Sequence, residues 1–248
     1  GQQRALEALA AQQQFIAMVS HEFRSPLAVI DISAQLLAKK PVVQTDSKAA
    51  TLVTRIRRGT VRLAQFLDTC LTQDRLRDTG LLLKPAALDL AALAGAASEG
   101  AQLLADHHRI VTEVQPDLPP LQGDAELLRI LLANLLSNAV KYSSPASEIR
   151  LRVTNVGDRH ILEIIDHGCG IPADEVSHIF EKYRRGRLAA GTPGAGLGLA
   201  LCWQIPQLHG GHIHVDSTQG VGTRVVVEFP AESSADAQTS QFADLPPT

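Results

Sequence analysis

The strongest constraint on the fold is a long helical pattern over residues 47–78. Apolar and small residues recur there at alternating spacings of three and four, the heptad pattern of a coiled-coil seam: Ala49, Leu52, Ile56, Gly59, Leu63, Phe66 and Cys70. A first helix is expected from about Arg4 to Lys40, followed by a turn over Lys39–Asp46 in which Asp46 caps the second helix. Such a hairpin cannot cover its own apolar stripes. We therefore expect a homodimer forming a four-helix bundle, with a monomeric hairpin packed on a second domain as the alternative.

The first helix contains the segment Ser20–Leu27, which reads SHEFRSPL. Pro26 cannot donate a hydrogen bond to the carbonyl of Glu22 and crowds it, so we expect a bend just past His21. A solvent-facing imidazole beside a carboxylate suits a nucleophile that is approached from outside, whereas the ordinary alternative is a surface histidine before a tolerated kink. His21 points almost opposite to the apolar stripe, which consists of Phe15, Val19, Phe23, Pro26, Leu27, Ile30, Ala34 and Leu37.

Composition narrows the class of protein. A net charge of −3 gives no reason to expect nucleic-acid binding, and 4% aromatic against 45% hydrophobic residues predicts an aliphatic core. Cys70, Cys169 and Cys202 lack metal-ligand spacing and are expected as buried thiols of a reducing compartment. With neither a signal peptide nor an apolar run of 18 residues, we expect a cytoplasmic fragment without membrane contact, which leaves a membrane-anchored parent open.

A second domain is expected over residues 89–230, after a first domain over residues 1–80 and a linker over residues 81–88. Strand and helix patterns interleave without βαβ regularity, so an α+β sandwich is favoured over a doubly wound sheet. Residues 231–248 are rich in Ser, Ala, Asp, Gln and Pro and are predicted to be disordered. The expected helices are Leu90–His107, Ala125–Tyr142 and Leu197–Leu208, and the expected strands are Arg109–Val114, Glu148–Val156, His160–Asp166, Gly211–Asp216 and Thr223–Phe229.

The helix over Ala125–Tyr142 has a well-defined polar face made by Asn134, Asn138, Lys141 and Tyr142. Its amides can offer neutral oxygen to a cation and its lysine can offer positive charge to phosphates. Amide oxygen alone holds Mg²⁺ weakly, which fits a metal that arrives with a nucleotide. A solvated helix face is the alternative, although such a face usually carries mixed charges.

Two glycine-rich segments follow. In Asp166–Gly170 a carboxylate at a strand end precedes two glycines. The carboxylate could accept a hydrogen bond from the exocyclic amine of adenine, and the glycines let the backbone approach a ligand. The alternative is that the segment is an ordinary turn. In Gly194–Leu199 glycines open a helix, where free backbone N–H groups can cradle phosphate, but the Lys-Ser/Thr end of a P-loop is missing.

The order and spacing of these segments resemble the sensor histidine kinases. Residues 21–27 resemble the phospho-acceptor box, with Ser25 where threonine is usual, and the later segments resemble the ATP-binding domain of the gyrase-like fold. Residues 179–185 resemble the family's phenylalanine box. The resemblance extends from about Phe15 to Phe229. It implies ATP and Mg²⁺ as cofactors, autophosphorylation of His21, and transfer of the phosphoryl group to an aspartate of a response-regulator receiver domain.

The resemblance also implies roles for individual residues. Asn138 would coordinate Mg²⁺, Asn134 and Lys141 would serve the phosphates, and Asp166 would read adenine N6. Glu22 would hold the proton of the attacking imidazole, and Arg185 would reach the γ-phosphate. The remaining predicted nucleotide-site residues are Tyr142, Gly168, Gly170, Ile171 and Phe180 around the base, and Gly194, Gly196, Leu197, Gly198 and Leu199 at the lid.

Four departures from the family pattern stand out. His167 replaces an asparagine, Cys169 replaces a larger aliphatic residue, Arg184 replaces an aromatic, and Pro206 is expected to kink or shorten the helix after the glycines. Ser25 keeps a hydroxyl but loses the β-branch that restricts its rotamer, so we expect only weak phosphatase activity toward the receiver.

Two other classes of function compete with a kinase. One is a scaffold that keeps the fold without turnover, which an intact motif set disfavours. The other is a gyrase-type ATPase. Those enzymes usually carry a glutamate where this chain has Asn134, so the sequence favours transfer to His21 over hydrolysis.

Overall fold

The computed structural model describes residues 23–25, 27–76, 83–105, 107–181 and 198–231. The chain divides into two compact units, residues 1–81 and residues 82–248, and each is described here by itself. Across the described ranges no helix is both long enough and apolar enough to cross a membrane.

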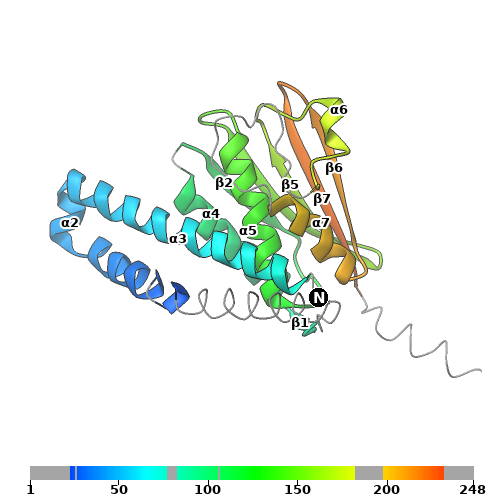
Figure 1. The fold of residues 1–248 in the computed structure, drawn as a ribbon, viewed down its shortest axis with the longest axis horizontal. Coiled ribbons are helices and arrows are strands. Elements are labelled where there is room, and N and C mark those ends of the chain that lie inside the picture. The colour runs from blue at the N-terminus through cyan, green and yellow to red at the C-terminus, as the bar shows by residue number, and fades with distance from the viewer. Residues whose placement is uncertain (1–22, 26, 77–82, 106, 182–197, 232–248) are drawn as a thin grey trace, which may run out of the picture. The chain divides into compact units, whose positions relative to one another are not determined.

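The first unit is a helical hairpin. Residues 27–38 are helical and are followed by α2 (Pro41–Thr45) and α3 (Ser47–Arg75), drawn in blue to cyan in Figure 1. Asp46 caps α3 as predicted, because its carboxylate accepts hydrogen bonds from the backbone N–H groups of Lys48 at 2.9 Å and Ala49 at 3.2 Å. The predicted turn contains α2, which was not expected. Pro41 stands at its start, where a proline favours a helix and its missing N–H costs nothing.

The hairpin is held by a small apolar contact surface and by ion pairs. Leu27, Ala34 and Val53 are buried. Arg24 donates from Nη2 to Oδ1 of Asp68 at 2.8 Å, which joins the first helix to α3. Asp68 is buried, so this pair is better shielded from water than an ordinary surface ion pair.

The heptad seam of α3 points away from this contact. Leu52, Ile56, Leu63 and Phe66 are between 44% and 57% exposed in the single chain. The first helix is similar, with large apolar side chains exposed at Phe23, Val29, Ile30, Ile32, Leu36 and Leu37. Exposed apolar side chains that are aligned along a helix in this way are typical of a protein–protein interface.

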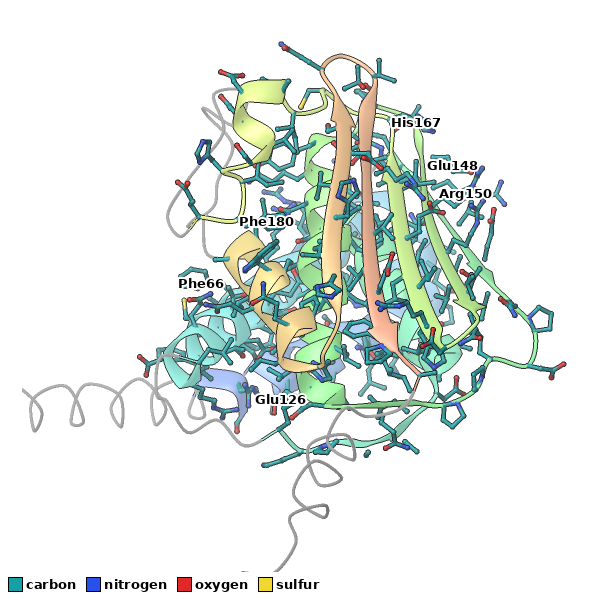
Figure 2. The ribbon with its side chains drawn as sticks, turned by 90° about the vertical axis from the view of Figure 1, so that its right-hand side faces the viewer. Phe66, Glu126, Glu148, Arg150, His167 and Phe180 are labelled. Atoms are coloured by element: carbon teal, nitrogen blue, oxygen red, sulfur yellow. The ribbon has the colours of Figure 1, made fainter. Side chains whose placement is uncertain are left out.

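The second unit is an α+β sandwich, as predicted. A five-stranded sheet has the order β2 (Arg109–Val114), β4 (Glu148–Val156), β5 (Arg159–Asp166), β7 (Gly222–Pro230), β6 (His212–Thr218). β2 and β4 are parallel and the other neighbours are antiparallel. Helices α4 (Leu90–Leu104), α5 (Ala125–Tyr142) and α7 (Gly198–Leu208) lie together on one face of the sheet (Figures 1 and 2).

The core of this unit is aliphatic, in line with the composition. Four leucines of α5 are fully buried, and they face alternate residues of the central strands. The largest buried side chains are Leu90, Leu121, Leu128, Ile130, Leu131, Leu132, Leu136, Ile149, Leu151, Leu162, Leu201 and Phe229. Burial of each leucine contributes about 1.5–3 kcal/mol, which makes α5 the most strongly anchored helix of the unit.

Several expected boundaries are wrong. α4 ends at Leu104 instead of His107, because Ala105 adopts an extended conformation at ψ 104°. Residues 86–88 belong to the expected linker, yet they form β1 (Ala86–Leu88), which pairs antiparallel with β3 (Leu121–Gly123). A short helix, α6 (Ala173–Val176), was also not expected. Elements of three to four residues carry too little periodicity to be recognised in a sequence. The tail over residues 232–248 lies outside the described residues.

Pro206 lies in the last turn of α7 and finds a structural explanation there. Its carbonyl accepts a hydrogen bond from Gly211 N–H at 2.8 Å, while the carbonyl of Gln207 accepts one from Gly210 N–H at 3.0 Å. Gly210 has φ +68°, so this is a Schellman C-cap. The helix continues only two residues beyond Pro206, so the proline stands where the helix is already ending in this cap.

His209 joins the end of α7 to the start of α5. Its Nδ1 donates to the carbonyl of Ile205 at 2.8 Å, and its Nε2 accepts from the backbone N–H of Asp124 at 2.9 Å, which fixes the neutral tautomer. Burial lowers the pKa of His209, and this effect outweighs the opposing effects of the Ile205 carbonyl and the Asp124 carboxylate. The imidazole therefore works as a neutral connector between two helices.

Replacing His209 with alanine is expected to destabilise the second unit by roughly 2–4 kcal/mol, since it removes two buried hydrogen bonds and leaves a void. Because the folded pKa lies below the unfolded value, the stabilisation is present above pH 6.5 and is lost as pH falls below it. Urea unfolding followed by fluorescence of Trp203, the one tryptophan of the chain, measures this. His160 is also buried with a lowered pKa, but it is present in both proteins. If the free energy of unfolding changed with pH in the same way in the wild type and the variant, this role of His209 would be contradicted.

Candidate functional site

The polar face of α5 ends beside the loop that follows β5. The N–H of Cys169 donates to the carbonyl of Tyr142 at 3.2 Å, and the N–H of Ser144 donates to the carbonyl of His167 at 3.1 Å. A Cβ on Gly168 would collide with the Tyr142 carbonyl, so no larger residue fits this crossing. The two sequence motifs, distant along the chain, are thus joined by backbone hydrogen bonds.

The other side of the same loop is held by the hairpin between β6 and β7. The N–H of Gly220 donates to the carbonyl of Cys169 at 2.8 Å, and the N–H of Ile171 donates to Oγ of Ser217 at 2.8 Å. Gly170 has φ +63°, a conformation that favours glycine, and its Cα also lies against the carbonyl of Thr218. The backbone of residues 166–171 is therefore fixed on both sides.

These elements enclose a pocket of about 130 Å³. Its wall is mostly apolar, with few polar groups, which is typical of a site for a flat organic ligand. The residues that line it are Leu135, Asn138, Ala139, Tyr142, Ile164, Asp166, Cys169, Gly170, Ile171, Pro172, Glu175, Ile179, Phe180, Leu199, Val215, Thr223 and Val225.

Asp166 is the most unusual group in this pocket. Its side chain is only 9% exposed, and Oδ1 is buried with no hydrogen-bond partner among the described residues. Burial raises the pKa of Asp166 to about 6, although the backbone amides of Gly168 and Thr223 and the nearby His167 favour the charged form. A buried acceptor left open inside an apolar pocket is the arrangement expected where a ligand supplies the donor.

Phe180 lines the pocket and packs against Trp203 of α7. The rings of Phe180 and Trp203 have centroids 5.3 Å apart at an interplanar angle of 37°, and Figure 2 shows Phe180 beside α7. This pair packs the segment after α6 against α7. Residues 182–197 lie outside the described residues.

The start of α7 contacts the polar face of α5. The side-chain N–H of Asn134 donates to the carbonyl of Ile130 at 2.8 Å, which turns its Oδ1 toward Gly198. Any Cβ at Gly198 would collide with that oxygen. Lys141 lies over the ring of Tyr142, with Nζ 4.9 Å from the ring centroid. Asn134, Lys141 and Gly198 do not line the pocket themselves, but each is the chain neighbour of a residue that does, namely Leu135, Tyr142 and Leu199.

Comparison with known proteins identifies both units. A family model described as the His Kinase A (phospho-acceptor) domain matches residues 11–79. A second, described as histidine kinase-, DNA gyrase B-, and HSP90-like ATPase, matches residues 123–233. The circadian input-output histidine kinase CikA of Synechococcus elongatus is 32% identical over 238 residues, covering 92% of this chain and 31% of CikA. The chain belongs to the sensor histidine kinases.

Other relatives agree with this assignment. The alginate biosynthesis sensor protein KinB of Pseudomonas aeruginosa is 32% identical over 231 residues, with 92% of this chain and 38% of KinB covered. Among solved structures, full-length ShkA in complex with AMPPNP has a TM-score of 0.61 at 28% identity, covering 89% of this chain and 46% of ShkA. The mycobacterial sensor kinase MprB has a TM-score of 0.55 at 28% identity over 60% of this chain and 99% of that chain. This chain spans about a third of the length of CikA and KinB.

The kinase fold brings part of the predicted site together. Seven predicted residues line the pocket: Asn138, Tyr142, Asp166, Gly170, Ile171, Phe180 and Leu199. Four more, Gly168, Asn134, Gly198 and Lys141, do not line the pocket but are chain neighbours of residues that do. Ser25 is exposed on the first helix of the other unit. The remaining predicted residues lie outside the described residues: His21, Glu22, Arg185, Gly194, Gly196 and Leu197.

Several pocket residues were not predicted. Thr223, Val215 and Val225 reach the pocket from β6 and β7, and Glu175, which is buried, reaches it from α6. A strand has side chains on two faces, and its sequence does not say which face will meet a ligand. For β7, the pairing of Thr223 with Asp166 in the sheet places Thr223 beside the pocket.

Proposed function

We propose that this chain binds Mg·ATP in the pocket of the second unit, phosphorylates its own His21, and passes the phosphoryl group to an aspartate of a response-regulator receiver domain. The observation that carries the proposal is the buried Oδ1 of Asp166, which has no hydrogen-bond partner among the described residues and lies in an apolar pocket at the end of α5. The free thiols of the chain favour a reducing, cytoplasmic setting.

The pocket residues fit an adenine base. Ile164, Ile171 and Val225 offer apolar surface to the ring, and Asp166 can accept the exocyclic N–H of N6. The carboxylate form is required for the strongest acceptor, and a pKa of about 6 leaves Asp166 ionised at neutral pH. The base therefore satisfies the acceptor that the protein leaves open.

The phosphates would extend along α5 toward Asn134, Lys141 and the start of α7. Asn138 is the residue that would hold Mg²⁺, an ion that neutralises charge on the triphosphate when it is bound. The lysine ammonium and the backbone N–H groups at the helix start supply further positive potential. Positioning and charge neutralisation of this kind are the main protein contributions to phosphoryl transfer.

In the transfer step, a neutral imidazole nitrogen of His21 attacks the γ-phosphorus in line and the bond to the ADP oxygen breaks. Glu22 holds the proton of the other ring nitrogen, and Arg185 stabilises charge on the γ-phosphate. The phosphohistidine then donates the phosphoryl group to the receiver aspartate. Hydrolysis is the competing outcome. Asn134 is a neutral amide bonded to the Ile130 carbonyl, so it lacks the acid that would activate water.

The experiment that tests this function follows γ-³²P-ATP into two products, phosphohistidine and free phosphate. A kinase accumulates acid-labile label on the chain with little free phosphate, a gyrase-type ATPase releases phosphate, and a scaffold does neither. Mixing a His21→Gln subunit with an Asn138→Asp subunit then separates two routes of transfer. Label on the Asn138→Asp chain shows transfer across a dimer, and absence of label on both chains shows transfer within a protomer.

We further propose that the chain forms a homodimer through its exposed heptad seam, making a four-helix bundle. Replacing Phe66, which is 50% exposed in the single chain, with glutamate is expected to weaken dimerisation by at least about a hundredfold, because each dimer would bury two unpaired charges. Sedimentation velocity measures the dissociation constant. Gln65→Glu adds the same charge about 100° around the helix and serves as the control. Equal dissociation constants for the two variants would place the dimer interface elsewhere.

Ser25 bears on dephosphorylation of the receiver. Because its hydroxyl is exposed and its rotamer is not restricted by a β-branch, it positions water poorly. We expect slow receiver dephosphorylation in the wild type, a further loss of about tenfold or less in Ser25→Ala, and a gain in Ser25→Thr. Decay of phosphorylated receiver is the measurement. Robust dephosphorylation that survives Ser25→Ala would contradict this expectation.

A further inference from the structure

Cys169 is a free thiol inside the pocket that we assign to ATP. It is half-buried and lines the cavity together with Asp166, Tyr142 and Phe180. Its backbone is fixed on both sides, since its N–H bonds to the Tyr142 carbonyl and its carbonyl accepts from Gly220. The backbone of Cys169 is therefore held at the pocket wall by two hydrogen bonds, and the thiol moves only by rotation about the Cα–Cβ bond.

A second, independent feature marks this cavity as a ligand site. The side chain of Asp166 is 9% exposed and its Oδ1 lacks a partner among the described residues. An adduct on Cys169 and a base bound to Asp166 would occupy the same cavity of about 130 Å³. They cannot do so together, because a pocket of this size has no room for both.

We infer that Cys169 is a modification site for α,β-unsaturated carbonyl electrophiles, and that its modification blocks nucleotide binding. In the reaction the thiol adds across the carbon–carbon double bond. The sulfur forms a bond to the β-carbon, the π bond breaks, and the proton lost by sulfur ends on the α-carbon. No oxidant or reductant is needed. The inference rests on the proposed ATP site, and it gives the kinase a means of being switched off by electrophiles.

The other two cysteines differ in ways that favour Cys169. Cys202 is fully buried in α7, and burial raises its pKa strongly, so little thiolate forms and nothing reaches it. Cys70 lies on α3 in the other unit, and burial raises its pKa as well. The chain thus contains its own reference thiols, one that is inaccessible and one that belongs to the other unit.

The test uses N-ethylmaleimide on the full chain, with peptide mass spectrometry to quantify each cysteine. Cys169 is expected to be labelled in the absence of nucleotide and protected at least about tenfold by saturating Mg·AMPPNP, while labelling of Cys70 is independent of nucleotide. The labelled chain is expected to lose affinity for Mg·AMPPNP by at least about tenfold in calorimetry. Maleimide treatment of Cys169→Ala is expected to leave that variant's own affinity where it was, and Cys70→Ala is expected to respond as the wild type does.

Two results would overturn the inference. One is Cys169 that stays unlabelled while Cys70 reacts. The other is a chain labelled at Cys169 that binds Mg·AMPPNP as tightly as the unlabelled chain. Failure of the proposed function looks different, since untreated wild-type chain would then not bind Mg·AMPPNP at all, whatever the labelling pattern.

Discussion

Replacing His21 with glutamine is expected to remove at least about 99% of the label that the chain acquires from γ-³²P-ATP, because the amide has no nucleophilic ring nitrogen. Binding of Mg·ATP is expected to persist, since the pocket residues all lie in the second unit. The loss of label is measured as acid-labile ³²P on the chain, and the binding of Mg·ATP is measured by calorimetry. A large effect is expected because no other group can replace the acceptor.

The matched control is His212→Gln. His212 is an exposed histidine at the start of β6 and does not line the pocket. This variant is expected to be labelled like the wild type. Label that persists in His21→Gln and disappears in His212→Gln would refute His21 as the acceptor.

Replacing Asp166 with asparagine is expected to act on binding and stability in opposite directions. The affinity for Mg·ATP is expected to fall by about 10–100-fold, because a charge-assisted acceptor is lost and the new amide N–H₂ faces the N–H₂ of adenine. Burial raises the pKa of Asp166 from 3.8 to about 6, so the folded chain pays for holding this charge at neutral pH. Because the substitution removes the charge, the free energy of unfolding at pH 7.5 is expected to rise by up to about 3 kcal/mol. A residue that destabilises the fold and serves the ligand is a functional residue.

The pH dependence of both effects follows from the same pKa. Above pH 6 the folded chain holds a charge that burial penalises, whereas below pH 3.8 the carboxyl is protonated in both the folded and unfolded chains. The stability gain of Asp166→Asn is therefore expected to shrink as pH falls from 7 to 4. The affinity of the wild type for Mg·ATP is expected to decrease as the pH falls below 6, whereas the affinity of the variant is expected to change less. Urea unfolding monitored by Trp203 fluorescence, together with calorimetry, measures these effects.

A stability gain that stays the same at pH 4.5 would show that the buried charge is not its cause. An unchanged affinity would show that Asp166 does not contact the base. Glu148→Gln, on the first residue of β4, removes an exposed carboxylate that is paired with Arg150 (Figure 2), and is expected to change stability by less than about 1 kcal/mol. This control separates a general effect of losing negative charge from the effect of this pocket.

Some of the structure could be predicted because its causes are local. The helix over residues 125–142 and the strands over residues 109–114 and 148–156 have the predicted bounds. Asp46 caps α3 as expected, and Asp124 caps α5 in the same way, since a cap depends on neighbours two or three residues away. The polar face of α5 follows from the helical period alone.

The sequence by itself determined that a helical region precedes an α+β unit, and it determined the amphipathic helices, because periodicity and capping act within one element. The roles of the candidate site residues stay predictions. Only the tertiary structure decided the rest. It placed Thr223 and Val215 in the pocket wall, tied Cys169 to both Tyr142 and Gly220, and left Oδ1 of Asp166 without a hydrogen-bond partner in the part of the chain that is described. The physical reason is that burial depends on segments far apart in the chain meeting in one place. The pKa of Asp166 is a consequence of that meeting and cannot be read from its neighbours in sequence.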